Sequence, residues 1–151
     1  MPEVLFYHLQ RQPLERVLPL LLEKTLERGW KAIVRAGSAE RLAALDELLW
    51  TYREESFLPH GTKADGVPET QPVYLTLEDE CPNSAECAFI TDGAAMPERD
   101  AYERIVLLFD GNDPDALLSA RQVWRDVRVK GFSATYWQQD DNGRWEKKAS
   151  S

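Results

Sequence analysis

Residues with catalytic or metal-binding potential are few in this chain of 151 residues. His8 and His60 lie far apart in the sequence, and neither has a neighbouring nucleophile that it would activate as a general base. Cys81 and Cys87 lack the Cys-x2-Cys spacing of zinc sites, and the acidic residues around them disfavour a reactive thiolate. We therefore predict no catalytic residue and no metal site, and we favour two reduced thiols over a disulfide.

The segments that follow the expected strands contain little that would bind phosphate. They are the relevant positions, because α/β proteins often hold nucleotides at the carboxyl ends of their strands. Residues 8–12 follow the first expected strand and contain no glycine. Gly37 is a single glycine just before the expected helix at 38–50, and one glycine is only weak evidence for a phosphate-binding loop. The turn at 110–113 brings two carboxylates, Asp110 and Asp113, which repel phosphate. The sequence predicts no nucleotide site and no cofactor.

The stretch from 113 to 132 has the most informative pattern of side chains. At 100° per residue, Arg121, Arg125 and Arg128 share one arc of the helix, and Leu117 and Trp124 border it. A separate narrow arc predicts the core face: Ala116, Ala120, Val123 and Val127. The guanidinium group of arginine can bind a carboxylate through two parallel hydrogen bonds. This surface therefore suits an acidic peptide whose apolar side chain would contact Leu117 and Trp124. The alternative is a solvated basic face with the tryptophan in the core.

Composition limits the classes of function. Hydrophobic residues make up 43% of the chain and charged residues 29%, which is typical of a globular domain. The formal net charge of −8 disfavours direct binding to the nucleic-acid backbone. No apolar run approaches about 18 residues, and the acidic start does not resemble a signal peptide. We expect a cytoplasmic protein that does not enter the membrane.

Hydrophobic periodicity predicts a single α/β domain over residues 1–151, with a frayed tail at 148–151. Gly29 would end the first helix, Ser38 would cap the second, and Asp113 followed by Pro114 would cap the third. Residues 141–143 predict a hairpin turn into an antiparallel edge strand. We expect strands at 4–7, 31–36, 56–59, 73–77, 87–90, 104–109, 132–138 and 144–147, and helices at 13–28, 38–50 and 113–130, with at most a helical turn at 96–102. This order predicts a mainly parallel sheet between two helical layers, a nucleotide-binding-like topology without a nucleotide site.

Three segments carry a resemblance to a known family: 46–50 (DELLW), 55–60 (ESFLPH) and 121–132, which ends in VKGF. In order and spacing, the chain resembles the chi subunit of bacterial DNA polymerase III along most of its length. The resemblance implies an accessory subunit without catalytic activity. It also implies two partners: the psi subunit, which links it to the clamp loader, and the acidic C-terminal tail of the single-stranded-DNA-binding protein. Nucleic acid would then be reached only indirectly.

The family's tail-binding residues fall on positions in two regions of this chain. The resemblance implies a site formed by Trp50, Phe57, Leu117, Arg121, Trp124, Arg125 and Arg128. Leu117 stands where the family has a lysine, and Trp124 stands where tyrosine is more usual. Leu117 is therefore expected to extend the apolar wall at the cost of one charge.

Two other functions compete with this interpretation. Direct binding of single-stranded nucleic acid would use Trp50, Trp124 and the arginines, against the negative net charge. A small-molecule enzyme would use the carboxyl edge of the sheet, where no catalytic group is identified.

Overall fold

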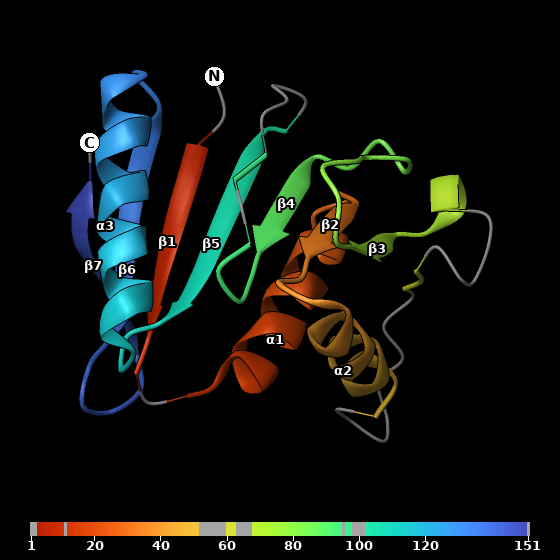
Figure 1. The fold of residues 1–151 in the computed structure, drawn as a ribbon, viewed down its shortest axis with the longest axis horizontal. Coiled ribbons are helices and arrows are strands. Elements are labelled where there is room, and N and C mark those ends of the chain that lie inside the picture. The colour runs from red at the N-terminus through yellow and green to blue at the C-terminus, as the bar shows by residue number, and fades with distance from the viewer. Residues whose placement is uncertain are drawn as a thin grey trace.

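The computed structural model describes residues 3–10, 12–51, 60–62, 68–94, 96–97 and 102–150. The expected strand at 56–59 lies outside these ranges, as does most of the expected turn at 96–102. The elements follow in the order β1 (Glu3–Leu9), α1 (Leu14–Glu27), β2 (Ala32–Arg35), α2 (Ala39–Thr51), the 3-10 helix η2 (Pro68–Thr70), β3 (Val73–Thr76), β4 (Cys87–Ile90), β5 (Arg104–Asp110), α3 (Pro114–Val129), β6 (Ser133–Gln139) and β7 (Trp145–Ser150) (Figure 1).

The described strands form one seven-stranded sheet in the order β3-β2-β4-β5-β1-β6-β7. Every neighbouring pair is parallel except β6 and β7, which form the antiparallel hairpin that the sequence predicts. In this register Phe6 of β1 lies opposite Leu107 of β5 on one side and Tyr136 of β6 on the other. The predicted fold class, a mainly parallel α/β domain, is confirmed.

Helices cover both faces of the sheet, which gives three layers. Leu18 and Leu22 of α1 and Leu45 and Leu49 of α2 belong to one buried cluster. Buried residues of α3 belong to a second cluster, together with Phe6 of β1. Successive residues of a strand point to opposite faces, so these two clusters lie on opposite sides of the sheet. Figure 1 also shows α2 near β3 at one end of the sheet and α3 beside β6 and β7 at the other.

The predicted helix ends are confirmed. Gly29 and Gly131 follow α1 and α3 with φ of 87° and 81°, the left-handed conformation that glycine adopts without strain. The Ser38 hydroxyl accepts a hydrogen bond from the Arg41 amide at 3.2 Å. The Asp113 carboxylate accepts one from the Asp115 amide at 3.0 Å. Local side-chain chemistry therefore fixes where α3 begins and ends.

The C-terminal strand is longer than predicted. We expected it to end at 147 with a frayed tail from 148, whereas β7 continues to Ser150. A register shift opposite Tyr136 and Trp137 lets the strand continue to pair with β6. The backbone pairing offered by β6 outweighs the low strand preference of the lysines, whose side chains are exposed at the sheet edge. Within the described ranges, no helix has the length and hydrophobicity needed to cross a bilayer.

Candidate peptide-binding site

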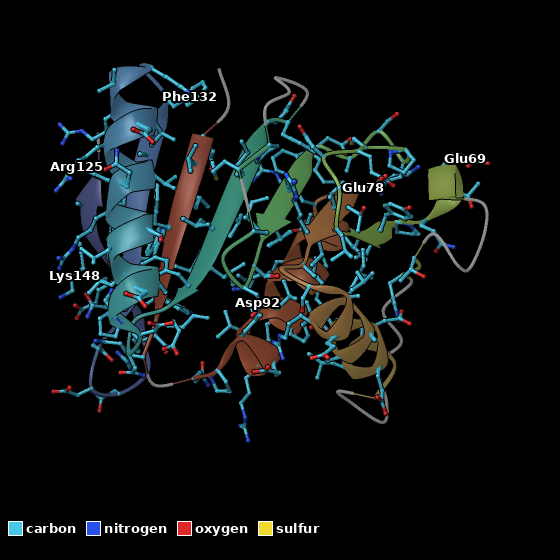
Figure 2. The ribbon with its side chains drawn as sticks, in the orientation of Figure 1. Glu69, Glu78, Asp92, Arg125, Phe132 and Lys148 are labelled. Carbon is cyan, nitrogen blue, oxygen red and sulfur yellow. The ribbon has the colours of Figure 1, made fainter. Side chains whose placement is uncertain are left out.

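The side chains of α3 are distributed as its helical wheel predicts. Ala120 and Val127 are buried against the sheet, with Ala116 and Val123 packed beside them. Leu117 and Trp124 are half-buried at the border, and the predicted basic residues are exposed: Arg121, Arg125 and Arg128. Figure 2 shows Arg125 on the side of the helix that faces away from β1.

The three arginines of α3 keep their charge available. Among the described residues, none forms an ion pair with Arg121, Arg125 or Arg128. The nearby carboxylate of Asp126 accepts a hydrogen bond from the Gln122 amide at 3.0 Å instead. Three guanidinium groups therefore lie on one surface with no ion-pair partner in the described part of the chain, and this surface can bind carboxylates.

Trp124 is fixed by aromatic contacts with the sheet. Its ring meets Phe6 edge-on, with centroids 5.2 Å apart, and meets Tyr136 at 6.0 Å with an interplanar angle of 80°. The Tyr136 hydroxyl and the Nδ1 atom of His8 are 2.7 Å apart, at hydrogen-bonding distance. The edge of the Trp124 ring is thus already held in place beside the arginines. Because the ring loses little conformational freedom when a ligand binds, the entropic cost of binding is lower.

Tyr136 and His8 adjoin Trp124 in the fold, and neither was predicted as a site residue. From the sequence, His8 is expected to have no catalytic role, and Tyr136 is expected only as part of a strand at 132–138. The available signal was the alternation of residues 132–138, which puts Tyr136 on one face of its strand. That signal does not indicate that this face meets Trp124, because the contact depends on the strand order.

The charge of this region comes from arginine. Burial lowers the pKa of His8, and the charge of Arg121 lowers it further. Burial raises the pKa of Tyr136, while Arg121 opposes that shift. Both partners of the hydrogen bond are therefore neutral at neutral pH, and Arg121 is close enough to influence each of them.

The other flank of α3 has the opposite charge. A cavity of about 960 Å³ lies at the carboxyl ends of β1 and β5, where it also contacts the starts of α1 and α3. Arg41, one of its lining residues, forms ion pairs with Glu15 at 2.9 Å and with Asp92 at 3.1 Å. The remaining lining carboxylates belong to Asp110, Asp113 and Asp115. This crevice is where related topologies bind nucleotides, but its charge disfavours phosphate.

The one glycine with a weak phosphate signal has a packing role instead. A Cβ atom at Gly37 would collide with the backbone carbonyl oxygen of Asp92. Only glycine therefore allows the loops after β2 and β4 to approach this closely. Within the described part of the chain, no group of three or more His, Cys, Asp or Glu side chains has an arrangement that would hold a metal ion.

The second predicted region lies apart from α3. The backbone of Trp50 belongs to the last turn of α2, which packs beside α1 and β3 on the opposite face of the sheet. Phe57 lies outside the described residues. The structure therefore brings Leu117, Arg121, Trp124, Arg125 and Arg128 together on one helix. A shared pocket with Trp50 and Phe57 stays a prediction.

These features define an α/β protein with a nucleotide-binding-like topology, an acidic cavity at its switch point and a basic, aromatic surface on its last helix. A family model described as "DNA polymerase III chi subunit, HolC" matches residues 1–135. A "Probable DNA polymerase III subunit chi" from Rickettsia prowazekii (strain Madrid E) is 30% identical over 117 residues, which cover 73% of this chain and 71% of that protein. The chain belongs to the DNA polymerase III chi subunit family, which places it among the accessory subunits of the replicative polymerase.

Proposed function

We propose that this accessory subunit binds the acidic C-terminal tail of single-stranded-DNA-binding protein through the exposed face of α3. The observation that carries the proposal is the juxtaposition of a half-buried, fixed Trp124 with three unpaired arginines on the described surface. Carboxylates of the tail would meet the guanidinium groups, and an apolar side chain would cover the exposed edge of Trp124. In this way the protein selects an acidic peptide while its own negative charge disfavours bare DNA.

The magnitudes predict a weak and reversible contact. Exposed ion pairs contribute about 0.2–1 kcal/mol each. Burying an apolar side chain adds about 1.5–3 kcal/mol. These contributions fall well short of the about −12 kcal/mol that a nanomolar affinity would require, so we expect an affinity no tighter than micromolar. A weak contact suits a polymerase that must release and re-engage protein-coated single strands as it moves.

We also propose that the psi subunit links this chain to the clamp loader, and that the chain has no catalytic activity of its own. Family membership supports the first statement. The second is supported by the structural surroundings of the reactive side chains. His60 is buried, with its Nε2 atom 3.1 Å from the Asp46 carboxylate. Burial raises the pKa of Cys87 to about 12, which suppresses the nucleophilic thiolate.

The tail proposal is tested by titrating the protein with a short acidic peptide that ends in Ile-Pro-Phe, with either a free or an amidated carboxyl terminus. We expect the free peptide to bind several-fold more tightly, and Arg125→Glu to weaken its binding at least tenfold at low salt. Lys24→Glu is the matched control, because Lys24 is exposed on α1 and its replacement changes the net charge by the same amount. Equal affinity for both peptides, or unchanged binding by Arg125→Glu, would refute the proposal.

The psi proposal needs a separate measurement. We expect purified psi subunit to form a stable complex with this chain in size-exclusion chromatography, and Arg125→Glu to leave that complex intact. Separate migration of the two proteins at concentrations of tens of micromolar would contradict it.

A further inference from the structure

We infer that Tyr136 of β6, held by His8 of β1, forms the sheet-side wall of the tail-binding surface. The inference rests on the proposed function, because it specifies the second wall of the same site. It concerns the α3–β6 surface, which comprises Leu117, Arg121, Trp124, Arg125, Arg128 and Tyr136.

The distance between α2 and α3 argues against a wall built from Trp50. The two helices lie on opposite faces of the sheet, and α2 packs beside β3 whereas α3 packs beside β5 and β6. With about 4.8 Å between strands and about 10 Å between packed layers, the helix axes are roughly 25 Å apart. An extended peptide needs about seven residues to cover that distance. One terminal side chain is therefore too short to span the distance between the backbones of the two helices.

Tyr136 occupies the position that a second wall requires. Its ring lies edge-on to Trp124, stacks on Phe6 with centroids 6.3 Å apart, and is half-exposed. The hydrogen bond between its hydroxyl and His8 restrains the direction of the ring. An apolar side chain lying across the exposed edges of Trp124 and Tyr136 would cover two aromatic surfaces without any rearrangement, and Arg121 would be near enough to meet its carboxylate.

Charge directs an acidic peptide to this flank of α3. The cavity along the opposite flank is lined by Asp110, Asp113 and Asp115, and like charges there repel the peptide. On the β6 side, the positive charge of Arg121 acts on both His8 and Tyr136, and Asp110 also acts on His8. The partner that fits is an acidic peptide with a large apolar residue at its carboxyl end.

In this arrangement α3 supplies the basic residues, and the C-terminal hairpin supplies the aromatic wall. We expect Tyr136 to determine which terminal side chain of the peptide binds best. The arginines would determine the general preference for peptides that carry carboxylates.

The test measures binding of two acidic peptides, one ending in Phe and one in Ala, to wild-type protein, Tyr136→Thr and Trp137→Thr. Threonine keeps the strand preference and removes the ring. Trp137 is the matched control, because it neighbours Tyr136 on β6 but stacks on Tyr7 at the opposite face. We expect Tyr136→Thr to bind the Phe-ended peptide about tenfold more weakly and the Ala-ended peptide within twofold of wild type. Trp137→Thr should match wild type for both.

Each outcome decides the matter. If Tyr136→Thr binds the Phe-ended peptide like wild type while Arg125→Glu does not, the wall is elsewhere and the proposed function stands. If Trp50→Ala alone removes the preference for Phe, the original pocket is correct. If wild-type protein binds neither peptide, the proposed function itself fails. Should Tyr136→Thr unfold, Tyr136→Leu, which keeps an apolar side chain, replaces it and is expected to retain part of the preference.

Discussion

Replacing Gly111 with alanine tests how closely the loop between β5 and α3 covers His8. The Gly111 amide donates a hydrogen bond to the Leu9 carbonyl oxygen at 2.6 Å, which ties the loop to the end of β1. A Cβ atom at this position would overlap the imidazole ring of His8. Gly111 is not among the glycines with positive φ, so its replacement has no conformational penalty of that kind. The cost of alanine is therefore steric, and His8 is the residue that must move.

The expected magnitude follows from two contributions. Forcing an extra methyl group into a packed site costs about 1–3 kcal/mol. Displacing His8 also breaks its hydrogen bond with Tyr136, which contributes about 0.5–1.5 kcal/mol. We therefore expect Gly111→Ala to lower the free energy of unfolding by about 2–4 kcal/mol. For a chain of this size, that change corresponds to a decrease in Tm of about 5–15 °C.

The assay is a double-mutant cycle measured by urea unfolding with tryptophan fluorescence. In the His8→Ala background the ring is absent, so Gly111→Ala should cost less than about 1 kcal/mol, which makes the coupling energy about 1–3 kcal/mol. Gly143→Ala is the control, because Gly143 has φ of 79° and no atom within 4 Å of a Cβ, so its cost should not depend on His8. If Gly111→Ala costs the same with and without the His8 ring, the steric explanation is wrong.

Three further measurements test other parts of the structure. Because burial raises the pKa of Cys87 to about 12, we expect a thiol reagent to modify Cys87 only after denaturation; rapid native labelling would contradict this. Asp113→Ala should lower the free energy of unfolding by about 1 kcal/mol through loss of the helix cap, and Asp113→Ser should retain most of it; equal losses would argue against capping. The folded pKa of His8 lies below its unfolded value, so its contribution to stability is complete above about pH 6.5 and is lost as the pH falls. Wild-type protein should therefore lose more stability than His8→Gln between pH 7.5 and 5.5, and identical losses would contradict the shift.

Much of α3 could be predicted from sequence because its determinants are local. Asp113, Pro114 and Gly131 fix its ends, and the 100° period separates its core residues from its arginines. The half-buried Trp124 at the border followed from the same wheel. These features depend on residues within one helix, so no knowledge of the rest of the fold was required.

The contact between Trp124 and Tyr136 could not be predicted in this way, because it depends on the strand order. The crossovers from β1 to β2 and from β2 to β3, which contain α1 and α2, run toward the β3 edge of the sheet, whereas the crossover from β5 to β6 runs toward the β7 edge. Right-handed crossovers in opposite directions place their helices on opposite faces. This rule puts α3 on the other side of the sheet from α2, and therefore away from the backbone of Trp50. A single sequence does not reveal that β6 lies beside β1, so the contact between Trp124 and Tyr136 was missed.

The charge pattern of α3 explains how a nucleotide-binding-like topology comes to present a surface for an acidic peptide. Asp113 and Asp115 lie at the N-terminus of α3, where the helix dipole stabilises negative charge, and they line the crevice that would otherwise attract phosphate. Arg125 and Arg128 lie toward the C-terminal end, where the dipole stabilises positive charge. The charges that stabilise the helix therefore also separate an anion-repelling end from an anion-attracting one. An acidic peptide is expected to meet α3 along the face that carries Arg121, Arg125 and Arg128, beside β6.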